Sequence, residues 1–122
     1  MSQNVLVTKV FAVGDRRTSI ADTLVDANGT AINLSGHTVA FLMVPESTGT
    51  PIKVNYAAAT VDDATAGQVS YAWAAADVDT AGTYCYWWRI TRTSDSKVEH
   101  FPADQDRANN DIKRRVIFES PT

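Results

Sequence analysis

Three features of the sequence predict an all-β fold, an antiparallel sandwich of about seven to nine short strands. Hydrophobic residues make up 44% of the 122 residues, and only four of them are leucine, whereas valine and alanine are abundant and three tryptophans and four tyrosines are present. β-branched and aromatic residues suit the pleated, half-buried surface of a sheet. Turn-forming residues recur at short intervals, and between them large apolar residues alternate with polar ones. This pattern is typical of short strands packed in two layers.

Segments of strand length lie between turn signals such as Asp26-Ala27-Asn28-Gly29. Asn-Gly and Asp-rich turns supply the left-handed or side-chain-bonded backbone that hairpins require. The expected strands are residues 5–13, 18–25, 30–34, 38–44, 52–61, 67–73, 83–93, 97–101 and 112–119. Residues 74–81 are rich in alanine and predict a helix of one or two turns. Because a chain of this length has room for one core, residues 1–122 are expected to form a single domain.

Alternation divides the side chains of the expected strands between two faces. In 83–93 the inner set is Tyr84, Tyr86, Trp88 and Ile90, and the outer set is Cys85, Trp87, Arg89 and Thr91. The inner residues of the other two clear cases are Val69, Tyr71 and Trp73, and Val39, Phe41 and Met43. Trp87 is therefore an aromatic residue that is expected to face away from the core.

Charge and cysteine content exclude several classes of protein. The net charge is −3 and there is one cysteine, Cys85, so neither an internal disulfide nor a cysteine-rich zinc site is expected. The mildly acidic balance argues against broad binding to nucleic acid. The apolar stretches are far shorter than a membrane span, and residues 1–4 do not resemble the start of a signal peptide. We therefore expect synthesis in a reducing cytoplasm and no membrane partner.

Several turn-and-strand motifs follow one another in a characteristic order. They are Gly14-Asp15, then TLVDANGT at 23–30, INLSGHTVAF at 32–41, ATVDDATAGQVSY at 59–71, DTAGTY at 79–84 and VEHFP at 98–102. Their order resembles that of the immunoglobulin-like domain found at the N-terminus of phage upper baseplate proteins and in related small phage virion proteins. The resemblance covers about residues 14–118.

This resemblance implies a fold and a role. The fold is an immunoglobulin-like antiparallel β-sandwich, and the role is that of a virion structural protein, a small adaptor or attachment subunit of the tail or baseplate that is present in several copies. It would be made in the host cytoplasm and would bind other virion proteins. The chain ends at Thr122 without the coiled coil or receptor-binding module of such relatives, so the adaptor domain alone is expected. Two alternatives stay open: a decoration protein of the capsid, and a carbohydrate- or receptor-binding module.

The segment 79–84 also resembles the corner before a late strand of immunoglobulin sandwiches, where a tyrosine hydroxyl bonds back to the backbone. Tyr84 would be this tyrosine. A buried tryptophan, Trp73 or Trp88, would then fill the core in place of a disulfide. The alternative is that these residues only form a turn.

Residues that could carry chemistry are few. The histidines are His37 and His100, the thiol is Cys85, and no Gly-x-Ser-x-Gly motif or glycine-rich phosphate loop is present. We therefore expect neither an enzyme nor a bound cofactor. The acidic stretch 104–111 has oxygen ligands for calcium but lacks the turn glycine and glutamate of a calcium hand, so turn formation is the alternative interpretation.

Aromatic and basic residues outside the expected core are the candidates for a protein interface. Tryptophan and arginine are favoured anchors at interfaces, and basic runs could dock onto an acidic neighbouring subunit or only protect strand edges. The candidate residues are Trp87, Arg89, Arg16, Arg17, Lys113, Arg114 and Arg115. For a carbohydrate site, Trp87, Arg89 and the loops at one end of the sandwich would be used.

Overall fold

The computed structural model describes residues 5–26, 28–46, 48, 51–101 and 112–120, and it describes the backbone alone for residues 5–8 and 112–114. The strands are β1 (Val5–Ala12), β2 (Ile20–Thr23), β3 (His37–Pro45), β4 (Val54–Ala58), β5 (Thr60–Asp63), β6 (Gln68–Tyr71), β7 (Gly82–Arg92), β8 (Val98–Phe101) and β9 (Ile112–Glu119). One short 3-10 helix, η1 (Ala75–Asp77), lies between β6 and β7. The predicted helical segment 74–81 thus contains a helix of three residues.

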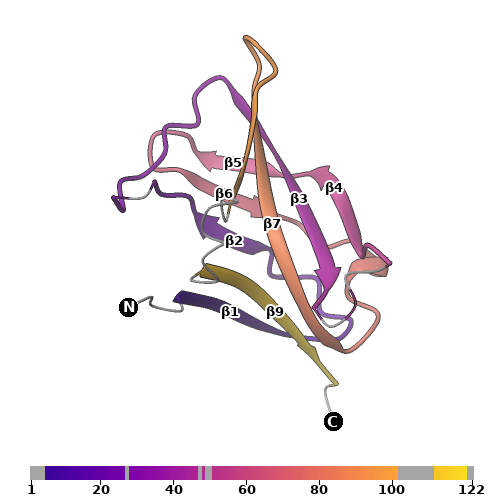
Figure 1. The fold of residues 1–122 in the computed structure, drawn as a ribbon. Helices are drawn as coiled ribbons and strands as arrows, with labels where there is room; N and C mark the ends of the chain where they lie inside the picture. The colour runs from indigo at the N-terminus through magenta and orange to yellow at the C-terminus, as the bar shows by residue number, and fades with distance from the viewer. Residues whose placement is uncertain (1–4, 27, 47, 49–50, 102–111, 121–122) are drawn as a thin grey trace.

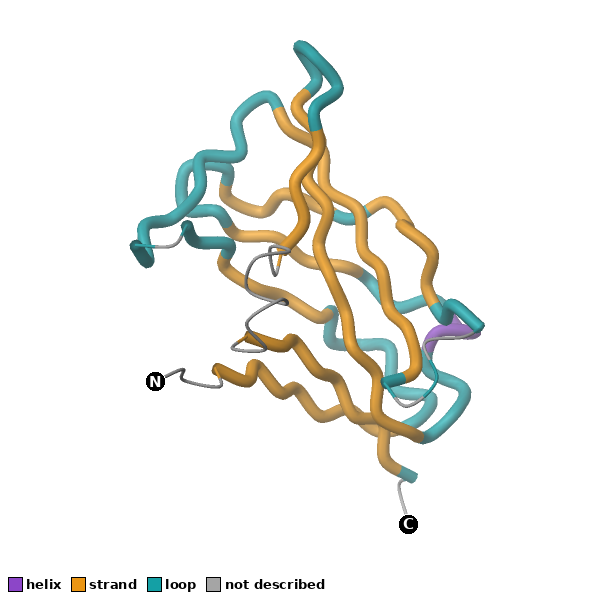
Figure 2. Tube along the Cα trace, viewed as in Figure 1, coloured by secondary structure: helices purple, strands orange, loops and turns teal. Residues whose placement is uncertain are grey.

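The strands form two sheets that pack face to face, which confirms the predicted all-β sandwich (Figure 1). The larger sheet has the order β1-β9-β7-β3-β4, with β8 also paired to β7, and the smaller has the order β2-β6-β5. The smaller sheet therefore contains β2, β5 and β6, and the other strands lie in the larger sheet. Figure 2 shows that the turn after β7 extends beyond the body of the sandwich.

β8 and β9 lie one after the other along the same edge of β7. β8 pairs antiparallel with Trp88–Thr91, and β9 pairs antiparallel with Gly82–Cys85. On its other side β9 pairs with β1, and this pair is parallel. This is the one parallel pair among the described strands, and the other strand pairs of the predicted sandwich are antiparallel. β1 and β9 lie at opposite ends of the chain, so no tight hairpin forces them to run in opposite directions.

The predicted strand 30–34 is wrong, because this segment forms a loop with one isolated bridge between Val25 and Ala31. The Asp26 carboxylate accepts hydrogen bonds from the backbone amides of Asn28 (2.9 Å) and Thr30 (3.0 Å), and it holds the chain in a turn. Leu34 then donates its amide to the Ala64 carbonyl (2.8 Å). The apolar residues of the loop pack into the core without joining a ladder.

The predicted strand 52–61 is two strands in different sheets. β4 pairs with β3 in the larger sheet, and β5 pairs with β6 in the smaller one. Ala59 lies between them and donates its amide to the Val39 carbonyl (2.9 Å). The chain therefore crosses between the layers here, which a continuous run of strand-forming residues does not reveal.

Aromatic rings fill the space between the two sheets. All ten inner residues predicted from alternation are buried: Val39, Phe41, Met43, Val69, Tyr71, Trp73, Tyr84, Tyr86, Trp88 and Ile90. The Phe41 ring stacks on Tyr71 with centroids 4.7 Å apart, and Trp73 meets Phe11, Phe41 and Phe118 edge to face. Such pairs add stabilisation beyond the apolar area that they bury. Both Trp73 and Trp88 thus serve as core fillers.

A buried carboxylate connects the two sheets of this chain, which has a single cysteine and therefore no internal disulfide. Asp22 on β2 has a side chain that is only 7% exposed. Its Oδ2 accepts hydrogen bonds from the Tyr86 hydroxyl (2.9 Å) and from Trp88 Nε1 (2.8 Å), both on β7. Lys9 Nζ on β1 lies 3.6 Å from the other carboxylate oxygen. One side chain thereby links three strands.

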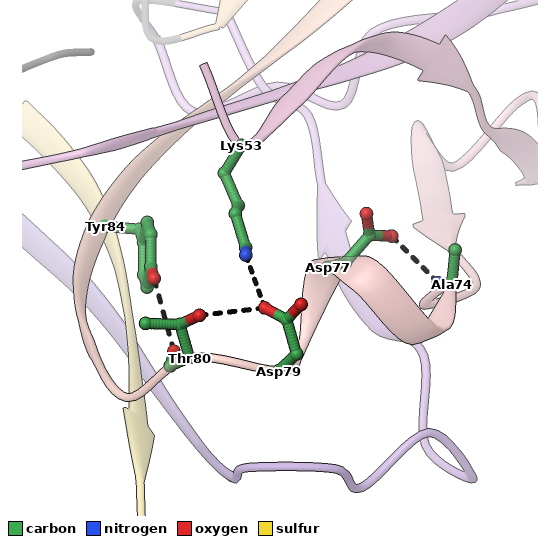
Figure 3. Close-up of polar contacts among 6 residues, drawn as sticks. All are labelled: Lys53, Ala74, Asp77, Asp79, Thr80 and Tyr84. Atoms are coloured by element: carbon green, nitrogen blue, oxygen red, sulfur yellow. Dashed lines mark hydrogen bonds and ion pairs between the residues drawn. The ribbon is translucent and has the colours of Figure 1, made fainter. Parts of the chain in front are cut away.

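The segment before β7 is organised by short polar contacts (Figure 3). The Asp77 carboxylate accepts the Ala74 amide (2.8 Å) at the start of η1. The Tyr84 hydroxyl donates to the Thr80 carbonyl (3.2 Å), so the predicted tyrosine corner is present. Lys53 forms an ion pair with Asp79 (2.5 Å), and this contact lowers the pKa of the Asp79 carboxyl.

Raising the pH above 10 should remove the contribution that the Tyr71 hydroxyl makes to the free energy of unfolding. Burial, followed by the hydrogen bond that its hydroxyl donates to Asp77 (2.6 Å), raises the Tyr71 pKa well above the ordinary value near 10. The raised pKa means that the stabilisation is complete below pH 10 and is lost as the pH rises, since the unfolded chain then releases this proton first. We expect Tyr71→Phe to lower the free energy of unfolding by about 1.5–3 kcal/mol at pH 7.

Urea unfolding of the wild type and Tyr71→Phe at pH 7 and above pH 10 measures this effect. The difference between the two proteins should shrink above pH 10, by at most about 1.4 kcal/mol per pH unit. A difference that stays constant with pH would contradict the assignment. Tyr84→Phe is the matched control, because its hydroxyl bonds to a neutral carbonyl instead of a carboxylate.

Candidate protein-interaction surface

The outer face of the larger sheet is the surface that turns away from the smaller sheet. Along β7 the residues alternate between buried inner and half-buried outer positions, as predicted. The pairing register places Leu42 of β3 opposite Trp87, and Ala40 opposite Arg89. His100 of β8 lies opposite Arg89 on its other side. The predicted outer residues therefore stand in the middle of the sheet, flanked by strands on both sides.

Trp87 lies on the predicted face but is half-buried. It is therefore not the freely exposed aromatic residue that the sequence suggested. Its neighbours on the central strands, Leu42 and Val44, are half-buried as well. Their partial burial agrees with the sequence of β3, which carries apolar residues on both of its faces. The centre of the outer face is thus an aromatic and aliphatic surface with little exposed area.

A β-bulge brings Tyr56 onto this face. On β3 the residues Phe41 and Met43 pair with Ala57 and Val54, so that two residues of β4 stand opposite the single Leu42. Tyr56, within this bulge, has a φ of +52°, in the left-handed region that bulky residues rarely adopt. Bulges redirect side chains and are frequent beside functional sites. This one places the phenol ring over β7.

Tyr56, Arg89 and His100 form a compact group that we call the Arg89 cluster. The guanidinium carbon of Arg89 lies 4.1 Å from the centroid of the Tyr56 ring. The Tyr56 hydroxyl and His100 Nε2 share a hydrogen bond of 3.2 Å, and the two rings meet edge to face. All three side chains are half-buried. Arg89 Nε is fully buried and has no hydrogen-bond partner among the described residues.

A second polar group lies at the end of the outer face where β7 begins. The Glu46 carboxylate accepts hydrogen bonds from Arg115 Nη2 (2.6 Å) and Nε (2.8 Å), and the Cys85 thiol lies 3.7 Å from the same oxygen. Arg115 is one of the predicted interface cations, and its charge is therefore neutralised by a carboxylate of the same chain. Lys113 and Arg114 belong to the backbone of β9, and their side chains lie outside the described residues.

Arg16 and Arg17 are exposed in the loop between β1 and β2. This loop is attached near the start of β7, because Val13 donates its amide to Glu119 and Gly14 donates to Val78. Arg89 is in the second half of β7, seven positions beyond Gly82. The structure therefore does not gather all of the predicted residues into one surface, and among those with described side chains Trp87 and Arg89 are the pair that shares the outer face of β7.

The remaining candidate sites from the sequence give the following results. The acidic stretch 104–111, considered for calcium, lies outside the described residues. In the part of the chain that is described, no three histidine, cysteine, aspartate or glutamate side chains come together in a group that could hold a metal ion. The described residues also contain no helix with the length and apolar character needed to cross a membrane.

Two members of the Arg89 cluster could not be identified as such from the sequence. Tyr56 stands next to Asn55 in a short segment whose bulge has no turn signal, and only pairing with β3 reveals it. The sequence places His100 only within the expected strand 97–101. Its position opposite Arg89 depends on the register of the β7–β8 hairpin, which the length and type of the turn determine.

Comparison with known proteins adds no relative. The chain matches no protein-family model and no curated protein sequence. A functional argument therefore depends on the arrangement of its own residues and on the order of its motifs.

Proposed function

We propose that this chain is a structural subunit of a phage virion, an adaptor or attachment unit of the tail or baseplate that acts by protein–protein packing. The motif order described above supports the virion role. The observation that carries the packing role is the outer face of the larger sheet, where Tyr56, Trp87 and Arg89 lie together. Its partners would be other virion proteins, and several copies would be incorporated in each particle.

The composition of this face fits a protein interface better than an ordinary surface. Tyrosine, tryptophan and arginine are the residues most enriched among the dominant contacts of interfaces, near the centre of the contact. Trp87 and Arg89 belong to the central strand β7, and Tyr56 belongs to the neighbouring edge strand β4, so these side chains stand on strands and little conformational entropy is lost on binding. By contrast, the outward positions of the smaller sheet carry small or polar residues, namely Ala21, Thr23, Gln68 and Ser70.

The same geometry is less suited to carbohydrate. Sugars stack on exposed aromatic faces, but the Tyr56 ring is covered by the Arg89 guanidinium and Trp87 is half-buried. The loops that follow β2, β5 and β7 lie at one end of the sandwich, and they carry no tryptophan among their described residues. A protein partner with a complementary surface makes fuller use of this face.

Quantitative mass spectrometry of purified particles tests the virion role. We expect the chain in intact particles from a lysate of the host that produces it, at a handful to a few dozen copies. Hundreds of copies per particle would replace the tail or baseplate role with capsid decoration. Absence of the chain from particles that are otherwise complete would refute the proposal.

Hydroxyl-radical footprinting of the free chain and of intact particles tests which face is in contact. We expect oxidation of Tyr56 and Trp87 to fall in the particle, because packing against the outer face excludes water from both rings. Val25, which is 38% exposed in the loop after β2, is the internal control and should react equally in both states. Equal protection of Val25 and Tyr56 would argue against the outer face as the contact.

A further inference from the structure

We propose that the Arg89 cluster is a recognition site for a carboxylate group of an acidic protein partner, in which the Arg89 guanidinium binds an aspartate or glutamate side chain. This inference rests on the proposed packing role and specifies the chemistry of the partner. It is argued from the charge balance of the sheet, the support of the guanidinium and the surroundings of the cluster.

Charge balance is the first argument. Four described cations are paired with carboxylates of the chain: Lys9 with Asp22, Lys53 with Asp79, Arg92 with Asp95 and Arg115 with Glu46. Arg89 has no such partner among the described residues. Exposed cations such as Arg16, Arg17 and Lys97 are solvated by water, but Arg89 is half-buried and its Nε is shielded from water. The charge of a half-buried guanidinium that has no counter-ion is stabilised by an incoming anion.

The support of the guanidinium is the second argument. Stacking on the Tyr56 ring at 4.1 Å holds the guanidinium plane in one orientation, and the Tyr56–His100 hydrogen bond holds the ring. A planar guanidinium fork matches the two oxygens of a carboxylate. The left-handed backbone of Tyr56 stores strain, and such strain is typical of ligand clamps. The cluster is therefore organised before any ligand binds.

The surroundings favour a protein carboxylate over a phosphate polymer. Leu42 and Trp87, both half-buried, lie near Arg89 on this face and offer apolar contact to a polypeptide. A nucleic acid would need several cations in a row, whereas the nearest basic residue on β7, Arg92, is already paired with Asp95 (3.0 Å).

An NMR titration of the ¹⁵N-labelled chain tests the chemistry without a virion. The probe is a capped peptide of alternating glycine and glutamate, and the reference is the same peptide with glutamine. We expect the glutamate peptide to shift the Arg89 Nε–Hε signal in a salt-dependent way and the glutamine peptide to leave it unchanged. Arg89→Gln should weaken binding at least about tenfold, whereas Arg92→Gln, the matched control, should not weaken it.

Three outcomes of this titration would overturn the inference. The first is no shift at Arg89 with the glutamate peptide, and the second is an equal shift with the glutamine peptide. The third is a larger shift with inorganic phosphate than with the peptide at equal ionic strength, which would make the cluster a phosphate site.

Incorporation into particles separates this inference from the proposed function. Tagged wild type, Arg89→Gln and Arg92→Gln are supplied in trans during infection, and their ratio to the native chain is measured in purified particles. If the tagged wild type enters particles and Arg89→Gln enters at least about tenfold less, the inference holds. If all three enter equally, the carboxylate site is wrong while the virion role stands. If the tagged wild type does not enter although the native chain does, the tag is moved to the other terminus; if no native chain is present, the virion role itself fails.

Discussion

Replacing Asp22 by alanine should lower the free energy of unfolding by about 3–5 kcal/mol, the cost of removing one partner from a buried charged network. The substitution leaves the Tyr86 hydroxyl and Trp88 Nε1 without the oxygen that accepts from both of them, at 2.9 and 2.8 Å. Each unsatisfied buried donor costs about 1–3 kcal/mol. Lys9 loses its carboxylate at the same time. Urea unfolding at pH 7 measures the loss.

Two further variants make this prediction specific. Asp95→Ala removes an exposed ion pair with Arg92 and should lower the free energy of unfolding far less than Asp22→Ala does. The double variant Asp22→Ala with Tyr86→Phe removes acceptor and donor together, so it should cost less than the sum of the two single changes. Strict additivity, or a loss below about 1 kcal/mol for Asp22→Ala, would show that this carboxylate does not connect the sheets energetically.

Gly67→Ala should destabilise the protein by about 2–5 kcal/mol, since it combines backbone strain with a steric overlap. Gly67 follows β5 in the turn to β6 and has a φ of +68°. A Cβ atom there would lie 2.6 Å from the Leu24 carbonyl oxygen and 3.0 Å from that of Ile32, and both are backbone atoms of the adjacent loop. The loop would have to move and give up the hydrogen bond from the Leu24 amide to the Gly67 carbonyl (2.8 Å).

Gly36→Ala is the matched control for this effect. Gly36 has a similar φ of +72°, but a Cβ atom added there meets nothing within 4 Å. The Gly36→Ala substitution should therefore lower the free energy of unfolding only by the cost of the left-handed conformation, about 1–2 kcal/mol. Thermal or urea unfolding of both variants measures the difference, which reports the close approach of the loop to Gly67. Equal losses at the two glycines would mean that the loop adjusts freely.

Together these contacts explain how the domain holds its layers without a disulfide. Asp22 joins β2 to β7, Gly67 lets the loop after β2 pack on the turn between β5 and β6, and the stacked rings of Phe41 and Tyr71 fill the interior. A rigid sandwich of this kind presents the outer face of its larger sheet in one conformation. That property suits the proposed packing role, in which the face meets its partner preorganised.

Period-two alternation was sufficient to predict which side chains enter the core. The inner residues of β3, β6 and β7 are all as predicted, because burial of one sheet face imposes the pattern directly on the sequence. The ends of the strands and the sheet to which each strand belongs were harder to predict from the sequence. The segment 52–61 belongs to two sheets, and the segment 30–34 pairs through one bridge only. In both segments, hydrogen-bond partners that are distant in the sequence determine whether a strand forms and which sheet it joins.

The residues of the candidate site were likewise predicted only in part. Trp87 and Arg89 were identified from their outward phase on β7, whereas Arg115 was expected to be an interface cation and is paired with Glu46, a residue 69 positions away. No local pattern indicates such a pair. The parallel pairing of β1 and β9 likewise joins the two ends of the chain.

The sequence by itself determined the all-β class, the inner and outer faces of the main strands and the tyrosine corner, because these depend on alternation and on contacts within a few residues. Only the tertiary structure decided that Asp22 links the sheets and that Tyr56 covers Arg89 beside His100. Those contacts join residues between 11 and 66 positions apart, from Arg89–His100 to Asp22–Trp88. The physical reason is that their geometry follows from strand register and from a bulge, which exist only once the strands have paired.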